Sequence, residues 1–247
     1  IAATFSWYAA DNANTVGESI TQQASATINN TIFITSGGSQ TVVYTITPTS
    51  TLGCVGTSQT LNVAVTAPPT MTSSSSTTVC SGVAANLSLT ADAPSTFVWQ
   101  ANDNANTTGE STTPQTSSTL NDAITNNTSL PQTVIYTITP TSVGGCAGNQ
   151  QFVTVIVNPL PTVVANSSSL NVCPGSSITL TGSGAAIYSW DNGVTDGVPT
   201  IINNTTTYTV TGAGITGCVN TASITVNVYA LPAVVANASQ TEVCTGG

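Results

Sequence analysis

The chain has 247 residues and contains no lysine, arginine or histidine, so all nine of its charges are carboxylates and the formal net charge is −9. Without cationic side chains the protein cannot neutralise the phosphates of a nucleic acid or bind an anionic membrane surface electrostatically. It also lacks the histidine, lysine and arginine side chains that most enzymes use as bases, amine nucleophiles or anion clamps, so we predict that it is not an enzyme.

The remaining composition favours folded, non-membrane structure. Hydrophobic residues make up 40% of the chain, which is enough for buried cores, and threonine, serine and asparagine replace charged residues as the polar groups. No run approaches the 18 or so apolar residues that a membrane-spanning helix needs. The sequence opens with IAATFSWYAA, without an initiator methionine or a signal-peptide pattern, and we expect it to be an interior piece of a longer protein.

An internal repeat organises the chain. TFSWYAADNANTVGES, from Thr4, matches TFVWQANDNANTTGES, from Thr96, and QTVVYTITPTSTLGCVG, from Gln40, matches QTVIYTITPTSVGGCAG, from Gln132. A shorter copy contains YSWDNG, from Tyr188, and another copy begins near the end with AVVANASQTEVC. Such self-similarity is typical of tandem modules. It predicts a first module that lacks its opening strands, two complete modules, and the first strand of a further module, with boundaries at 1–69, 70–161, 162–232 and 233–247.

The predicted elements are strands, because apolar residues recur at every second position. One strand of each copy carries a tyrosine and an aliphatic residue on the same face, and the following strand carries three aliphatic residues. One tryptophan per copy lies in phase with these core positions, which suits the interior of an immunoglobulin-type sandwich. The residues that we expect to face the cores include Tyr44, Ile46, Leu61, Val63, Val65, Trp99, Tyr136, Ile138, Val153, Val155, Val157, Trp190, Tyr208, Val210, Ile224, Val226 and Val228.

Short proline-bearing segments separate the copies: TAPPT at 66–70, NPLPT at 158–162 and YALPA at 229–233. Proline fixes φ and favours extended geometry, so these junctions act as semi-rigid spacers. We therefore predict an all-β fold of tandem immunoglobulin-like, PKD-like β-sandwich modules arranged as an extended rod.

The motifs resemble those of known surface proteins. VCPGSSITLTGSG (172–184), the following SW, TTTYTVTGAGITGC and ASITVNV are similar to Ig-like repeats of very large Bacteroidota surface proteins. The longer copies, with DNANTTGES, VIYTITPTS and a final strand ending in NPLP, resemble the PKD-like domains found beside those repeats. Gliding-motility adhesins and other giant flavobacterial adhesins are built in this way. The resemblance implies a cell-surface location and export by the type IX secretion system.

The six cysteines are candidates for disulfides, since pairing is the usual fate of cysteine in an exported protein. Pairing within the complete modules would join Cys80 to Cys146 and Cys173 to Cys218, leaving Cys54 and Cys244 to partners outside the sequence. The alternative pairs neighbours across the junctions: Cys54 with Cys80, Cys146 with Cys173 and Cys218 with Cys244. We expect the pairing within modules, because the alternative must bring two sandwiches together across a whole module length, and bridged Cα atoms lie within about 7 Å of each other.

Two loops repeat a pair of carboxylates, Asp11 with Glu18 and Asp103 with Glu110. No basic side chain can neutralise them, and Ca²⁺ binds such oxygen ligands, so calcium is the one candidate metal. The alternative is that the carboxylates are simply solvated on a surface loop. No other cofactor and no catalytic residue is expected.

The leading functional hypothesis is a stalk segment of a bacterial extracellular filament or giant adhesin, which gives reach and mechanical strength for adhesion or motility. Its expected partners are the neighbouring modules of the same chain, further copies in a fibre, and surface polysaccharide. The alternative is an array of polysaccharide-binding modules, which would display exposed tryptophan or tyrosine in one divergent module.

Overall fold

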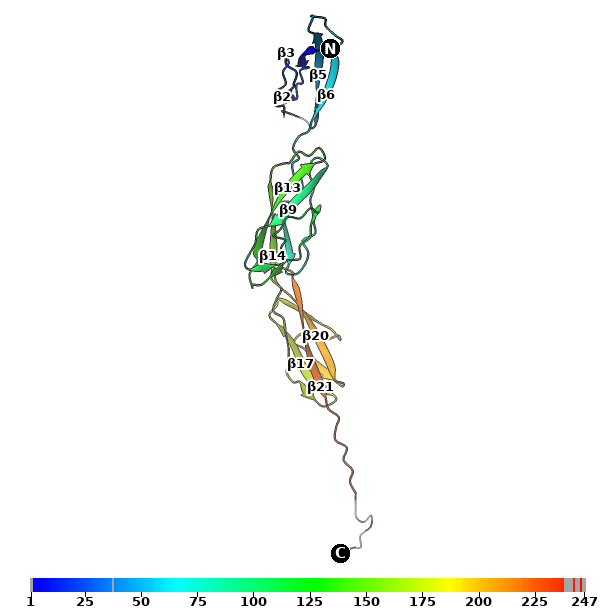
Figure 1. Cartoon of the computed structure of the whole chain (residues 1–247). Helices are drawn as coiled ribbons and strands as arrows, with labels where there is room; N and C mark the ends of the chain where they lie inside the picture. Colours follow the sequence, from blue (N-terminus) through cyan, green and yellow to red (C-terminus); the bar gives the residue numbers. More distant parts are fainter. Residues whose placement is uncertain (1, 37, 238–241, 243–244, 246–247) are drawn as a thin grey trace.

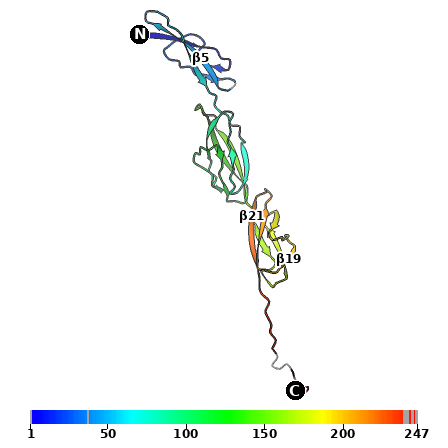
Figure 2. The same cartoon turned by 90° about the vertical axis from the view of Figure 1, so that its right-hand side faces the viewer.

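The computed structural model describes residues 2–36, 38–237, 242 and 245. These residues form 21 strands and no helix, so the predicted all-β class is confirmed. No helix in this part of the chain could cross a membrane. The strands gather in three bodies that follow one another along the molecule, and two views at right angles both show an extended rod (Figures 1 and 2).

The first module contains a four-stranded sheet in the order β3-β1-β5-β6 and a two-stranded sheet of β2 and β4. All of its pairings are antiparallel, and β5 pairs with both β1 and β6. Its strands are β1 (Ala3–Ala9), β2 (Thr15–Val16), β3 (Gln23–Ala24), β4 (Phe33–Ile34), β5 (Gln40–Ser50) and β6 (Gln59–Val65).

The second module has a four-stranded sheet in the order β7-β14-β13-β9. Strand β7 runs parallel to β14, whereas β13 pairs antiparallel with β9 and β14. The facing layer is built from two short pairs, β8 with β11 and β10 with β12. The strands are β7 (Ser76–Cys80), β8 (Leu87–Ser88), β9 (Ser95–Ala101), β10 (Thr107–Thr108), β11 (Thr119–Leu120), β12 (Thr125–Asn126), β13 (Gln132–Ser142) and β14 (Gln151–Asn158).

The third module has one sheet in the order β16-β21-β20-β18 and another in the order β15-β17-β19. Here β16 runs parallel to β21, as β7 does to β14 in the second module. The strands are β15 (Val164–Ser167), β16 (Asn171–Val172), β17 (Ser176–Ser183), β18 (Ile187–Trp190), β19 (Pro199–Ile202), β20 (Thr206–Ala213) and β21 (Val219–Val228). The strand predicted within 233–247 falls largely on residues outside the described part of the chain.

Each module buries its own tryptophan, as the alternating pattern predicts. Trp7, Trp99 and Trp190 are 3%, 2% and 8% exposed. In the first two modules the ring packs edge-on against the tyrosine of the central strand, with ring centroids 5.7 Å apart in both cases. Edge-to-face packing of this kind adds to the free energy gained from burying the apolar area. The repeated sequence therefore produces a repeated core.

The core of the first module is less covered than that of the second. Leu61 of β6 is 44% exposed, whereas Val153, which holds the same place in β14, is 1% exposed. Phe5 is 41% exposed and its counterpart Phe97 only 4%. The prediction that Leu61 faces a closed core is therefore wrong. The reason is that no described strand lies along β6 as β7 lies along β14.

Candidate functional site: the joint between the second and third modules

A disulfide crosses the joint between two modules, and its two cysteines come from opposite ends of their own modules. Cys80 ends β7, and because β7 is parallel to β14 it lies opposite Asn158, where the chain leaves the second module. Cys218 ends the hairpin turn between β20 and β21, at the end of the third module that faces the second (Figure 1). The Cα atoms of Cys80 and Cys218 are 5.6 Å apart, within bridging range.

This pairing corrects both predicted pairings within modules. Cys80 bonds to Cys218, while Cys146 and Cys173 are free in the structure. Cys146 lies in the turn between β13 and β14, and Cys80 at the opposite end of β14, so the length of the module separates them. The alternative pairing of Cys54 with Cys80 and Cys146 with Cys173 is wrong for the same topological reason, and its third pair, Cys218 with Cys244, is wrong because Cys218 bonds to Cys80.

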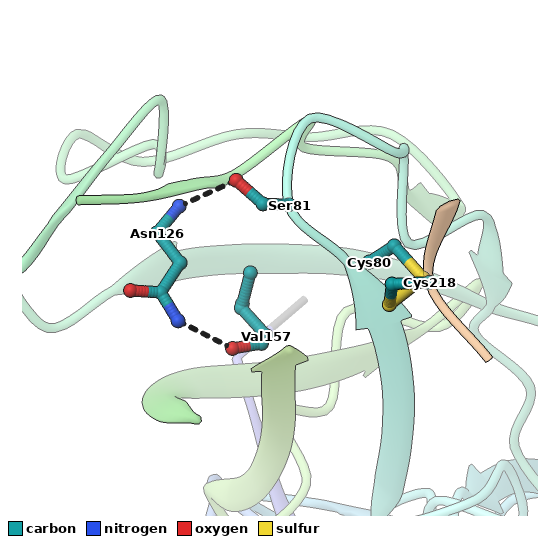
Figure 3. Close-up of a disulfide and its surroundings, with 5 residues drawn as sticks. All are labelled: Cys80, Ser81, Asn126, Val157 and Cys218. Atoms are coloured by element: carbon teal, nitrogen blue, oxygen red, sulfur yellow. Dashed lines mark hydrogen bonds between the residues drawn. A yellow bond between two sulfur atoms is a disulfide. The ribbon is translucent and has the colours of Figure 1, made fainter. Parts of the chain in front are cut away.

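Hydrogen bonds fix the end of the second module beside the disulfide (Figure 3). The backbone N–H of Asn126 donates to the Ser81 hydroxyl at 2.9 Å, and its side-chain Nδ2 donates to the carbonyl of Val157 at 2.9 Å. Asn126 thereby connects β12, the residue after Cys80 and the end of β14. Since Asn126 is buried, each of these bonds also prevents the cost of an unsatisfied polar group.

The third module contacts the linker as well as the disulfide. Asn220 donates from Nδ2 to the carbonyl of Pro161 at 3.1 Å. Gly214, in the turn after β20, lies against the ring of Pro161, where an added Cβ would lie 3.8 Å from the Pro161 Cβ. The joint therefore combines a covalent bond, a hydrogen bond to a proline-bearing linker and an apolar contact, which together restrict its bending.

A buried carboxylate, which the sequence patterns did not single out, braces the core of the second module. Asp122 is 9% exposed and accepts the Tyr136 hydroxyl at 2.7 Å. It also accepts the backbone N–H and the hydroxyl of Ser111, at 2.6 and 2.8 Å. Burial, followed by the hydrogen bond to Asp122 and the charge of that carboxylate, raises the pKa of Tyr136 far above its ordinary value.

The first module carries an amide at the place of this carboxylate. Asn30 accepts the Tyr44 hydroxyl at 2.8 Å and the Ser19 N–H at 3.0 Å, and donates to the Ser19 hydroxyl at 2.9 Å. The pKa of Tyr44 is also raised, mainly by burial and secondly by the charge of Glu18. The 92-residue repeat places Asn30 on Asp122, so a polar residue kept two positions before an isoleucine in both copies was the available signal.

The repeated carboxylate loops use their glutamates internally. Glu110 accepts the Thr107 hydroxyl at 2.7 Å and the Asn104 N–H at 3.3 Å, and Glu18 accepts the Thr15 hydroxyl at 2.6 Å. Asp11 and Asp103 are exposed. Within the described residues no group of three or more acidic, histidine or cysteine side chains gathers as a metal site. The arrangement braces the loop, and it assembles no Ca²⁺ coordination shell of the usual six to eight oxygens from these carboxylates.

Two-layer sandwiches repeated along an extended chain define a tandem immunoglobulin-like β-sandwich protein. Within that class, the chain belongs to the PKD-like domain family, whose model matches residues 1–69 and 77–161.

Several solved structures match the chain at low sequence identity. Titin domains I67–I69 are 10% identical, with 93% of this chain and 88% of that chain covered and a TM-score of 0.35. Drosophila N-cadherin EC1–4 is 12% identical, with 92% and 66% covered and a TM-score of 0.29. Protocadherin gamma B7 cadherin domains 1–4 are 12% identical, with 90% and 66% covered and a TM-score of 0.28. The chain spans about two thirds of the two cadherin structures. No curated protein matches it.

Proposed function

We propose that the chain is a stalk segment of an extracellular filament or giant surface adhesin of a Bacteroidota bacterium, exported by the type IX system and serving adhesion or gliding. Its units are divided as 1–69, 70–161, 162–232 and 233–247. Its work is mechanical: it holds a distal part of the molecule away from the cell and resists extension. A disulfide fits this setting, because such bonds persist in oxidising environments outside the cytoplasm.

The observation that carries the proposal is the path that a pulling force must follow. Tension that enters at the first module reaches Cys80, crosses the disulfide to Cys218 and leaves along β21. The chain segment between the two cysteines, which are 138 residues apart in the sequence, is thereby shielded from extension. Most of the second and third modules remain unstretched even if their hydrogen bonds break, which is the property that a tether requires.

The strands that bear the load once the disulfide is reduced are also well placed to resist force. β7 is paired in parallel with β14 over five residues, from Ser76 to Cys80. Because β14 lies within the segment that the disulfide shields, tension pulls β7 and β14 past each other only in the reduced chain, where it enters at the start of β7 and leaves at the end of β14. Their hydrogen bonds then resist together instead of opening one at a time.

The burial of the tryptophans supports the stalk over the polysaccharide-binding alternative. A sugar-binding face needs several exposed aromatic rings together, whereas Trp7, Trp99 and Trp190 are all buried in their cores and the exposed Tyr8 and Tyr229 lie in different modules.

Single-molecule stretching of the whole chain tests the proposal. At roughly 3.3–3.6 Å per extended residue, reduction of Cys80–Cys218 should lengthen the fully stretched chain by about 460–500 Å. The Cys218→Ser variant should show the longer extension without reductant. Equal extension in oxidised and reduced chains would refute the shielding, and specific binding of a bacterial polysaccharide would favour the alternative.

A further inference from the structure

The outer face of the four-stranded sheet in the second module carries apolar side chains where the other two modules carry hydroxyls. Phe152 of β14 is 60% exposed and Val98 of β9 is 44% exposed. The 92-residue repeat places Thr60 and Ser6 at these two positions in the first module. In the third module the same two places in the strand pairing are taken by serines, Ser223 and Ser189. The sandwich fold therefore does not need an apolar residue at either position.

A hollow of about 180 Å³ opens on this outer face, beside Phe152. Its lining comes from β9, from β13 and from the residue before β14: Val98, Trp99, Gln100, Thr137, Thr139 and Gln150. Phe152 lies directly opposite Thr137 in the pairing of β13 with β14, so the exposed ring stands beside the hollow and is not part of its lining. One face therefore presents a projecting aromatic side chain and a hollow next to each other.

A cross-strand hydrogen bond of the third module is replaced at this hollow. In the third module the hydroxyls of Thr209 and Ser223 lie opposite each other and hydrogen bond at 3.0 Å. Thr137 and Phe152 hold these places in the second module. Because a phenylalanine side chain neither donates nor accepts such a bond, the Thr137 hydroxyl faces the hollow and is available to a partner.

The outer face is also uncharged, in a chain whose every charged side chain is a carboxylate. Strands β7, β9, β13 and β14 contain no aspartate or glutamate. Copies of the chain repel one another in general, because the formal net charge is −9. On this face two copies can approach without bringing carboxylates together, whereas a cationic partner finds no opposite charge on it. The occupant that the face suits is therefore a second copy of the chain.

The positions of the ring and the hollow select one way of pairing two copies. A face that binds itself does so about a two-fold axis, which exchanges the projecting group and its receptor. Phe152 and the hollow lie at the same level along the strands, because Thr137, opposite Phe152, and Gln100, opposite Thr137, both line the hollow. An axis along the strands therefore places each ring over the other copy's hollow, whereas an axis across the strands would leave it over β14. Since these strands run along the rod, the first axis makes the two chains parallel (Figure 1).

We propose that two copies of the chain associate side by side and in the same direction through this outer face, with Phe152 of each copy in the hollow of the other. Each ring is then buried against Val98, and the amides of Gln100 and Gln150 at the margin of the hollow hydrogen bond to the second copy. The contact joins stalks laterally. It goes beyond the proposed function, which does not require it.

The area of the outer face sets the strength of the contact. Four strands about 4.8 Å apart, each with about eight residues at about 3.4 Å per residue, offer roughly 500 Å². Two such faces bury about 1,000 Å² together, which is at the lower end of the range for specific interfaces. We therefore expect a weak, reversible dimer, in which the two Phe152 rings contribute most of the binding free energy.

Analytical ultracentrifugation of the whole chain, with the free thiols alkylated to prevent new disulfides, provides the first test. The chain should dimerise as its concentration rises. Phe152→Thr, which installs the residue of the first module, should raise the dissociation constant at least about tenfold, as expected for an aromatic hot spot. Leu130→Thr is the matched control and should leave dimerisation unchanged, because it removes a comparably exposed apolar side chain from the turn between β12 and β13. A chain that stays monomeric, or an equal effect of the two variants, would overturn the proposal.

Complementary charges test whether the ring enters the hollow. Phe152→Asp should abolish dimerisation, because it places a carboxylate in the hollow of the second copy without a partner. Mixing this variant with Gln100→Lys should restore a mixed dimer, since one contact gains a pair of opposite charges and the other keeps Phe152. A mixture that does not associate would refute the insertion of Phe152 into the hollow.

The direction of the two chains is tested by labelling one end. A gold label on the first module, viewed by negative-stain electron microscopy, should mark the same end of the dimer twice, and labels at opposite ends would overturn the parallel arrangement. Binding of a bacterial polysaccharide that protects the amides of β9 and β13 in a monomeric chain would assign the face to carbohydrate and overturn the proposal. The stretching experiment on the single chain would be unaffected by any of these results.

Discussion

Asp122 in the second module and Asn30 in the first accept the same tyrosine hydrogen bond with different side chains. Asp122 accepts three hydrogen bonds from Tyr136 and Ser111 in a buried position, and Asn30 performs the same task in the first module. We therefore expect Asp122→Asn to be tolerated. Asp122→Ala should lower the free energy of unfolding by about 1–3 kcal/mol, because the buried Tyr136 and Ser111 donors lose their acceptor. Hydrogen exchange of the β13 amides would measure the free energy of unfolding of both variants. An equal loss of stability in Asp122→Asn and Asp122→Ala would contradict this role.

The raised pKa of Tyr136 predicts that the free energy of unfolding decreases at alkaline pH. Its pKa in the folded protein is raised above the ordinary value of about 10 by burial and by Asp122, so folding disfavours the ionised form. The contribution is fully present below pH ~10 and is lost as pH rises through the folded pKa. Absorbance titration of the six tyrosines should reveal a class that ionises only on unfolding. Tyr136→Phe should reduce that class by one, and ionisation of Tyr136 with the exposed tyrosines would refute the prediction.

At the scale of elements, the turn after β10 depends on a glycine. Gly109 has a φ of +97°, and a Cβ there would lie 2.6 Å from the carbonyl oxygen of Ala123. Gly145 has a φ of +83° with nothing within 4 Å of the added atom, so it is a matched control. Gly145→Ala should cost about 1–2 kcal/mol from backbone strain alone. Gly109→Ala should lower the melting temperature further, because the backbone must also move; equal effects would contradict the clash.

The disulfide should stabilise both modules that it joins. When only the third module unfolds, Cys80 remains beside Asn158, so the bond closes a loop of about 60 residues and contributes roughly 4 kcal/mol on the chain-entropy model. Cys218→Ser should therefore lower the stability of the third module, measured by hydrogen exchange of β20. Cys54→Ser, at the equivalent but unpaired position, is the control and should have no effect. An unchanged third module in Cys218→Ser would show that the bond is not formed.

Sequence patterns predicted the strands and the tryptophan cores because alternation is a local property. Tyr136 and Ile138, expected on one face of a strand, are both fully buried. The disulfide could not be predicted in this way, because it depends on which end of each sandwich a turn occupies. That end is set by the parallel pairing of β7 with β14, which joins residues almost eighty positions apart. Asp122 was missed for a similar reason, since only the fold brings Tyr136 and Ser111 to it.

For the whole molecule, shape follows from the joints. Each module has its own buried cluster, so the modules do not need one another's apolar surface, and the proline-bearing linkers keep them end to end (Figure 2). The second joint is further restrained by Cys80–Cys218, whereas no disulfide crosses the first joint within the described residues. We therefore expect the rod to bend more readily between the first and second modules than between the second and third.

Small-angle scattering of the monomer tests both the length and the stiffness of this rod. A compact chain of this size would have a radius of gyration of about 18 Å, and the extended arrangement should exceed that value clearly. Cys218→Ser should broaden the longest distances, because it frees the second joint, while Cys54→Ser should leave the scattering unchanged. A radius near the compact value would exclude the rod. A Cys218→Ser curve identical to that of the oxidised chain would show that the contacts of Asn220 and Gly214 with Pro161 of the linker, and not the disulfide, hold the joint straight.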